Sequence, residues 1–142
     1  MIEGMELPRV EHLITQERVN AYAEAAGDFN PIHLNAGFAK ESHFGRRIAH
    51  GMMIAATVSE CMSIAFGMDW VLSGSMKIRF RAPVFPGDRI ETRGTVKKVE
   101  FLDGDKHRVI CAINTVRCIM PDEETVITAE VKVDISAGNA PG

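Results

Sequence analysis

The chain has 142 residues, the length of one ordinary domain and enough to bury a sizeable hydrophobic core. Its residues are 46% hydrophobic and 25% charged, as in a globular protein rather than a disordered or fibrous one. The formal net charge of -3 provides no overall positive field, so we expect no nucleic-acid partner. Residues 1–142 are expected to form a single domain.

The sequence carries no sign of a membrane or secretory protein. No stretch approaches the roughly 20 apolar residues that span a bilayer, and the acidic segment 1–6 does not resemble a signal peptide. Cys61, Cys111 and Cys118 lie in apolar runs without a C-x-x-C pair, which is typical of buried, reduced thiols. We therefore expect a cytoplasmic protein with no membrane partner.

The first predicted element is a helix between Thr15 and Gly27. Val19, Tyr22 and Ala23 recur at helical spacing within it. Thr15 is a suitable N-cap, and Gly27 is a typical stop.

Two further helices are expected. Asn35 is a suitable N-cap for a short helix at residues 36–42. Residues 50–66 are apolar on nearly every face and contain no proline, which is typical of a buried helix.

The pattern changes to a period of two after Gly74. Met76, Ile78 and Phe80 alternate with basic residues, as in a half-buried strand. Three more strands are expected, at residues 89–101, 108–120 and 125–135.

Helices followed by strands predict an α+β fold, with one buried helix covered by a curled antiparallel sheet. We expect the core to cover about residues 10–135. The small and polar segment 136–142 is expected to be a mobile tail.

Asp28 and His33 are the first candidates for catalysis. The intervening Asn30 and Pro31 favour a turn that can bring the two side chains together, and Asn30 is expected to support the pair. A carboxylate and an imidazole directed at one point can hold a water molecule, accept its proton and return one. Hydration of an enoyl thioester requires this, because water attacks C3 while C2 takes a proton. Alternatively, Asp28 forms a turn and His33 is solvated.

Gly51 lies at the start of the long predicted helix, after His50. Free N–H groups there, with the positive end of the helix dipole, can stabilise an enolate oxygen on a thioester. Alternatively, Gly51 allows tight entry into the helix and His50 caps it. We count His50 as a further supporting residue.

Four segments together resemble the MaoC-like dehydratases, and above all their (R)-specific enoyl-CoA hydratases. They are residues 27–34 (GDFNPIHL), 38–39 (FA), 48–52 (IAHGM) and 83–88 (PVFPGD). The resemblance runs over about residues 15–135. It implies a hot-dog fold and reversible conversion of trans-2-enoyl thioesters to (R)-3-hydroxyacyl thioesters. It also implies a homodimer, or a dimer of dimers, with the active site at the subunit interface.

The resemblance assigns roles to individual residues. Asp28 and His33 correspond to the water-binding pair, and Gly51 to the glycine whose amide lies at the oxyanion. Ser59 corresponds to a helix serine that supports the pair, although a serine satisfied within a buried helix is the alternative. The roles of Asp28 and His33 as base and as proton donor stay open.

Contacts with the substrate are expected from two groups of residues. Met52 and Met53 are expected to line the acyl pocket. Nearby basic side chains could contact the phosphates of coenzyme A or an acidic carrier protein, or form an ordinary solvated face. They are Arg46, Arg47, Lys77, Arg79 and Arg81.

We expect no metal and no cofactor other than the coenzyme A or acyl carrier protein that carries the substrate. His12, His43 and His107 lack metal-ligand spacing, and the sequence has no glycine-rich phosphate loop.

Two other functions remain open. Hot-dog proteins include acyl-CoA thioesterases that use a carboxylate of the central helix, where Glu60 is the only acidic residue. A non-catalytic acyl-binding subunit of a heteromeric dehydratase is the other alternative, although the presence of Asp28 and His33 argues against it.

Overall fold

The computed structural model describes residues 2–136. The elements are β1 (Val10–Leu13), α1 (Gln16–Ala26), α2 (Pro31–Leu34), α3 (Ala36–Lys40), α4 (Gly51–Phe66), α5 (Met68–Ser73), β2 (Ser75–Phe80), β3 (Arg89–Phe101), β4 (Lys106–Ile119) and β5 (Asp122–Ser136). Ser136 thus belongs to a strand, and the rest of the expected tail, 137–142, lies outside the described residues. No helix within residues 2–136 has the length and apolar character needed to cross a membrane.

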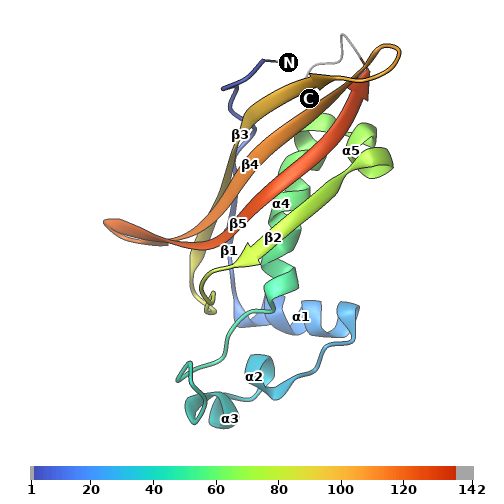
Figure 1. Cartoon of the computed structure of the whole chain (residues 1–142). Coiled ribbons are helices and arrows are strands. Elements are labelled where there is room, and N and C mark those ends of the chain that lie inside the picture. The colour runs from blue at the N-terminus through green and yellow to red at the C-terminus, as the bar shows by residue number, and fades with distance from the viewer. Residues whose placement is uncertain (1, 137–142) are drawn as a thin grey trace.

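The five strands form one antiparallel sheet in the order β1-β3-β4-β5-β2. The sheet curls, and α4 lies along its concave face (Figure 1). Val58 and Met62 of α4 and Ile113 and Val131 of the sheet are fully buried between the two layers. The predicted α+β hot-dog fold is confirmed.

The helix caps expected from the sequence are present. The hydroxyl of Thr15 accepts a hydrogen bond from the Arg18 N–H at 3.1 Å at the start of α1. Gly27 has a φ of 71°, in the left-handed region that favours glycine, and ends the helix. Asn35 caps α3 by accepting from the Phe38 N–H at 3.0 Å.

Three short elements are not predicted by the sequence pattern. β1 and α2 have four residues each, too few to show a period. The turn expected at Asn30 and Pro31 is one helical turn, because Asn30 caps it and proline fits the first helical position. α5 is held by Trp70, which is 8% exposed.

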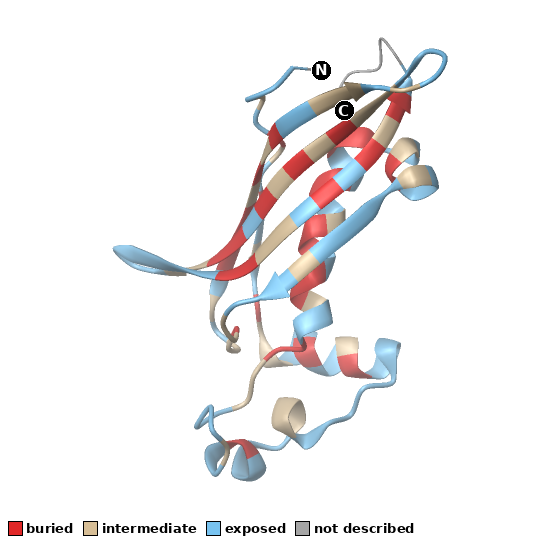
Figure 2. Cartoon of the chain, viewed as in Figure 1, coloured by how far each residue is buried: buried red, intermediate tan, exposed pale blue. Residues whose placement is uncertain are grey.

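The expectation that α4 is buried on nearly every face is wrong for the single chain. The sheet covers only one side of the helix, so Met52 is 62% and Ile64 is 46% exposed on the other. β2 also differs from the half-buried strand expected, because it lies at the edge of the sheet, and Met76 and Phe80 of its apolar face are 41% and 55% exposed. Figure 2 shows α4 with buried and exposed sides, and β2 almost wholly exposed.

A cluster of three buried threonines joins α4 to the sheet. The Thr92 hydroxyl donates to the Thr57 oxygen at 2.7 Å and lies 2.8 Å from that of Thr115. Thr57 in turn donates to the carbonyl of Ile54 at 2.7 Å. The hydroxyl groups therefore satisfy one another in an otherwise apolar core.

Candidate active site

Asp28 is held at the end of α1 by its own backbone and by the turn that follows. Its N–H donates to the Ala23 carbonyl at 3.1 Å, which completes the helix end. Its side-chain Oδ1 accepts from the Asn30 N–H at 3.2 Å, and Asn30 Oδ1 accepts from the Ile32 N–H at 3.1 Å. Asn30 therefore supports both the Asp28 carboxylate and the first turn of α2.

His33 projects from α2 and has a defined orientation. Its Nδ1 lies 2.8 Å from the carbonyl oxygen of Ile48. Because a carbonyl only accepts, Nδ1 must carry the hydrogen, and in the neutral ring Nε2 keeps its lone pair. The free nitrogen of His33 is therefore a proton acceptor.

His50 joins the pair from the residue before α4. Its Nε2 donates to the backbone carbonyl of Asp28 at 3.0 Å. Its ring stacks on that of His33 with centroids 3.8 Å apart and contacts Tyr22 at 4.8 Å. His50 is only 2% exposed, and its Nδ1 has no hydrogen-bond partner among the described residues.

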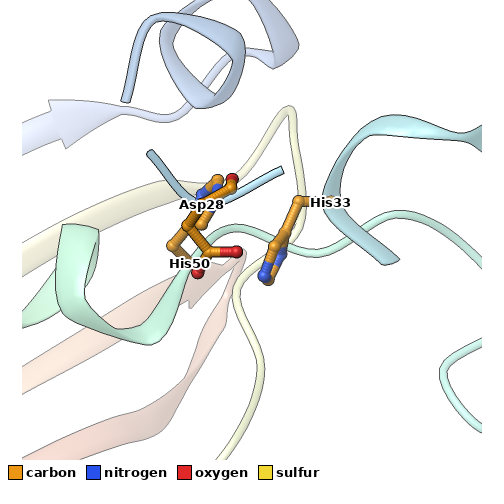
Figure 3. Close-up of side chains that lie close together, drawn as sticks. All are labelled: Asp28, His33 and His50. Atoms are coloured by element: carbon orange, nitrogen blue, oxygen red, sulfur yellow. The ribbon is translucent and has the colours of Figure 1, made fainter. Parts of the chain in front are cut away.

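The three side chains converge on one point, as Figure 3 shows. One ligand atom from each of Asp28, His33 and His50 lies within 4.8 Å of the others. A water molecule that donates both hydrogens at about 2.8 Å bridges acceptors about 4.6 Å apart. This upper limit of 4.8 Å is compatible with a water molecule held between the Asp28 carboxylate and the His33 ring.

The same three residues are of types that bind metals. A tetrahedral zinc site needs nitrogen lone pairs that converge on the ion at about 2.0–2.1 Å. The rings of His33 and His50 are inclined by only 28° and stacked, so lone pairs in the two ring planes run nearly side by side. This geometry fits a metal poorly, and the absence of a metal stays a prediction.

Gly51 lies at the N-terminus of α4, beside an apolar cavity of about 320 Å³. Within residues 2–136, no side chain caps this helix end by a hydrogen bond. A Cβ at Gly51 would lie 3.1 Å from the ring of Phe80, so glycine allows close packing here. The cavity is further lined by Phe44, Ile48, Ile54, Val84 and Ile127.

None of Ser59, Met52 and Met53 lines this cavity. The Ser59 hydroxyl accepts from Trp70 Nε1 at 2.9 Å, and no hydrogen bond joins it to Asp28 or His33 within residues 2–136. Met52 is exposed, and Met53 lines a separate hollow beside Glu60.

The basic candidates divide into two groups. The Arg46 guanidinium lies 3.7 Å above the centre of the Phe85 ring, and Arg47 donates to the Leu34 carbonyl at 3.5 Å. Lys77, Arg79 and Arg81 instead line a hollow on the outer face of the sheet, and Arg81 also lines the apolar cavity.

Two contributors to the site are missed by sequence reasoning. Ile48 acts through its backbone carbonyl, and because every residue has a carbonyl, the sequence does not indicate this role. Phe80 has a signal, the period of two in β2, but that pattern does not reveal that its ring packs against Gly51.

The sequence matches the MaoC like domain family over residues 3–116. It is 31% identical over 119 residues to a 3-hydroxybutyryl-CoA dehydratase of Methylorubrum extorquens, covering 84% of this chain and 75% of that protein. It is 30% identical over 120 residues to a mitochondrial 3-hydroxyacyl-[acyl-carrier-protein] dehydratase of Arabidopsis thaliana, covering 84% of this chain and 68% of that one.

The fold is also similar to the solved structure of an (R)-hydratase from A. caviae. The TM-score is 0.71 at 25% identity, with 94% of this chain and 96% of the other covered. Sequence match, overall fold and the motif-bearing segments agree, and the chain belongs to the MaoC-like domain family.

Proposed function

We propose that this protein catalyses the reversible hydration of trans-2-enoyl thioesters to (R)-3-hydroxyacyl thioesters. The observation that carries the proposal is the convergence of the Asp28 carboxylate and the His33 imidazole beside the start of α4. Membership of the MaoC-like family and relatives named as dehydratases support a hydro-lyase. The choice of carrier and the (R) stereochemistry of the product go beyond that support and are part of the proposal.

In the hydration direction, a water molecule donates its hydrogens to Asp28 and to His33 Nε2, which leaves a lone pair for attack on C3. Negative charge moves to the thioester oxygen, where the amide groups at Gly51 stabilise it. One residue of the pair accepts a proton from water, and the pair delivers a proton to C2. One water molecule is added, and the pair returns to its starting protonation state.

The substitution Asp28→Asn tests this assignment. It keeps the size of the side chain but removes the carboxylate, so kcat for hydration of crotonyl-CoA should fall by about 10²–10⁴-fold. Loss of absorbance of the enoyl thioester measures the rate. Asp105→Asn, in the exposed turn between β3 and β4, is the matched control and should leave the rate unchanged. A near-wild-type rate for Asp28→Asn contradicts the proposal.

We also infer that the protein forms a homodimer, or a dimer of dimers. Large apolar side chains of α4, α5 and β2 are exposed, and together we call them the exposed apolar face: Met52, Ile64, Val71, Leu72, Met76 and Phe80. Large exposed apolar patches commonly mark protein interfaces. β2 is also an edge strand, whose free backbone groups can pair with a second chain. Because Phe80 belongs to both this face and the cavity, the second chain would lie beside the active site.

The thioesterase alternative depends on Glu60. Its Oε2 accepts a hydrogen bond from His12 Nε2 at 2.6 Å, and both residues line a hollow separate from the apolar cavity. A thioesterase would release free thiol from a saturated acyl-CoA, and Glu60→Gln but not Asp28→Asn would abolish that release. The engagement of Glu60 by His12 favours a structural role instead.

The non-catalytic alternative makes the opposite prediction about the pure protein. An acyl-binding subunit would show no turnover alone and would become active when mixed with a second subunit. Asp28 and His33 are both in place, which supports catalysis by this chain itself.

A cytoplasmic location is proposed from the thiols. Cys61, Cys111 and Cys118 are free, and burial raises the pKa of Cys61 to about 11 and that of Cys111 to about 12. Such thiols are unreactive as nucleophiles and suit a reducing compartment.

A further inference from the structure

The outer face of the sheet carries a hollow of about 410 Å³ that the proposed chemistry does not use. Four basic side chains line it: Lys77, Arg79 and Arg81, at and just after β2, and Lys97 of β3. We call this hollow the basic groove. Its other lining residues are mostly small or neutral, among them Ala112, Asn114 and Thr128, and Glu130 is the one acidic residue.

The positive charge of the basic groove is offset only in part by Glu130, which stands opposite Lys77 in the sheet register. Within residues 2–136, none of its four cations forms an ion pair. Arg81 only donates to the Thr128 hydroxyl at 3.2 Å.

Several other arginines of the sheet are paired. Arg93 contacts Glu91 and Glu123, and Arg108 contacts Asp134. A chain with a net charge of -3 therefore concentrates unpaired cations in one hollow, which is the arrangement expected of a site for a polyanion.

The basic groove adjoins the apolar cavity. Arg81 lines both hollows, and its neighbour Phe80 packs against Gly51 at the start of α4. From Arg81 back along β2 to Lys77, four residue steps span about 13 Å at 3.3 Å per step. An extended ligand could therefore place one end at Gly51 and a charged end along the strand.

We propose that the basic groove binds the phosphate groups of coenzyme A while its pantetheine arm passes Arg81 into the apolar cavity. This inference rests on the proposed function. The diphosphate and the 3′-phosphate form a compact polyanion. One guanidinium group can donate two parallel hydrogen bonds to two oxygens of a phosphate. A concave hollow with a small-residue floor suits such a group better than the convex acidic surface of a carrier protein. Among the basic residues expected to contact the substrate, this proposal assigns the phosphate contacts to Lys77, Arg79 and Arg81 rather than to Arg46 and Arg47. Lys97 is a further contact.

The test compares a substrate that carries the phosphorylated nucleotide of coenzyme A with a truncated substrate that carries no phosphate. The double variant Lys77→Gln/Arg79→Gln should raise KM for crotonyl-CoA by about tenfold or more, with kcat nearly unchanged. Its kinetics on crotonyl-N-acetylcysteamine, which lacks phosphates, should equal those of the wild type. Lys98→Gln is the matched control, because Lys98 pairs with Glu100 at 3.2 Å and does not line the groove.

Calorimetric titration with coenzyme A itself separates this inference from the proposed function. If the wild type hydrates neither thioester, the proposed function fails, while a weaker affinity of the double variant for coenzyme A still supports the groove. Equal affinity of the double variant and the wild type overturns the groove. A double variant impaired only on carrier-protein-linked substrate also overturns it, because the occupant would then be an acidic protein.

Discussion

His50 connects the two residues of the proposed water-holding pair. It donates to the carbonyl of Asp28 at 3.0 Å and stacks on His33 with ring centroids 3.8 Å apart. The hydrogen bond fixes the turn that carries the Asp28 carboxylate, and the stacked ring restricts rotation of the His33 side chain. We therefore expect His50 to act as a positioning residue rather than as an acid or a base.

Two substitutions separate these effects. His50→Phe keeps a ring against His33 but removes the donor to Asp28, and kcat should fall by about 10–100-fold, because small misplacements of reacting groups cost this much. KM should change little, since His50 is buried and does not itself line the apolar cavity. His50→Asn keeps a donor without the ring, so a higher rate for Asn than for Phe assigns the larger effect to the hydrogen bond. Wild-type kcat for His50→Phe would remove the positioning role.

Residue types predicted much of this site, but not its fine geometry. Asp28, His33 and Gly51 stand in recognisable segments, and the structure brings Asp28 and His33 together. The hydrogen bond between His33 and the carbonyl of Ile48 is invisible in sequence, because every residue has a carbonyl. Ser59 is expected from the resemblance to support the pair, but its hydroxyl accepts a hydrogen bond from Trp70, and the sequence does not indicate this partner.

At the scale of elements, the threonine cluster holds α4 against β3 and β4. Thr92 is fully buried and bonds both Thr57 and Thr115. Thr92→Val keeps the shape of the side chain but leaves buried hydroxyl groups with fewer partners, which costs about 1–3 kcal/mol in free energy of unfolding. Urea denaturation followed by circular dichroism measures this. Thr95→Val, on the outer face of the same strand, should change stability by less than about 0.5 kcal/mol. Equal effects of the two substitutions would show that the cluster adds nothing.

The length of an element decided whether the sequence could predict it. α1 and α4 are long enough to show helical spacing and have marked ends, and the last three strands alternate over many residues. β1 and α2 offer four residues each, and their conformation is set by contacts with β3 and by the cap at Asn30. Local pattern therefore predicts the layers of the fold better than the connections that carry the active site.

At the scale of the whole molecule, hydrophobicity predicts that a surface is covered but does not say by what. The sequence of α4 is apolar on nearly every face, yet in the single chain Met52 and Ile64 are exposed. The sheet of the same chain covers only one side of the helix, as the burial colours in Figure 2 show. The predicted burial of α4 agrees with the structure if a second copy of the chain covers the exposed apolar face.

Burial of this face in a homodimer can be tested in solution. Ultracentrifugation of the wild type should give about twice the chain mass of 15.6 kDa for a homodimer, or about four times that mass for a dimer of dimers. Ile64→Glu places a charge in the exposed apolar face, where burial without a partner is costly, and should shift the protein to the monomer. Phe101→Glu is the control, because Phe101 is 85% exposed at the end of β3, outside this face, and its substitution should leave the dimer intact. Circular dichroism establishes that both variants are folded. A wild type that sediments as a monomer contradicts the prediction, as does an Ile64→Glu variant that remains a dimer, and the active site would then be complete within one chain.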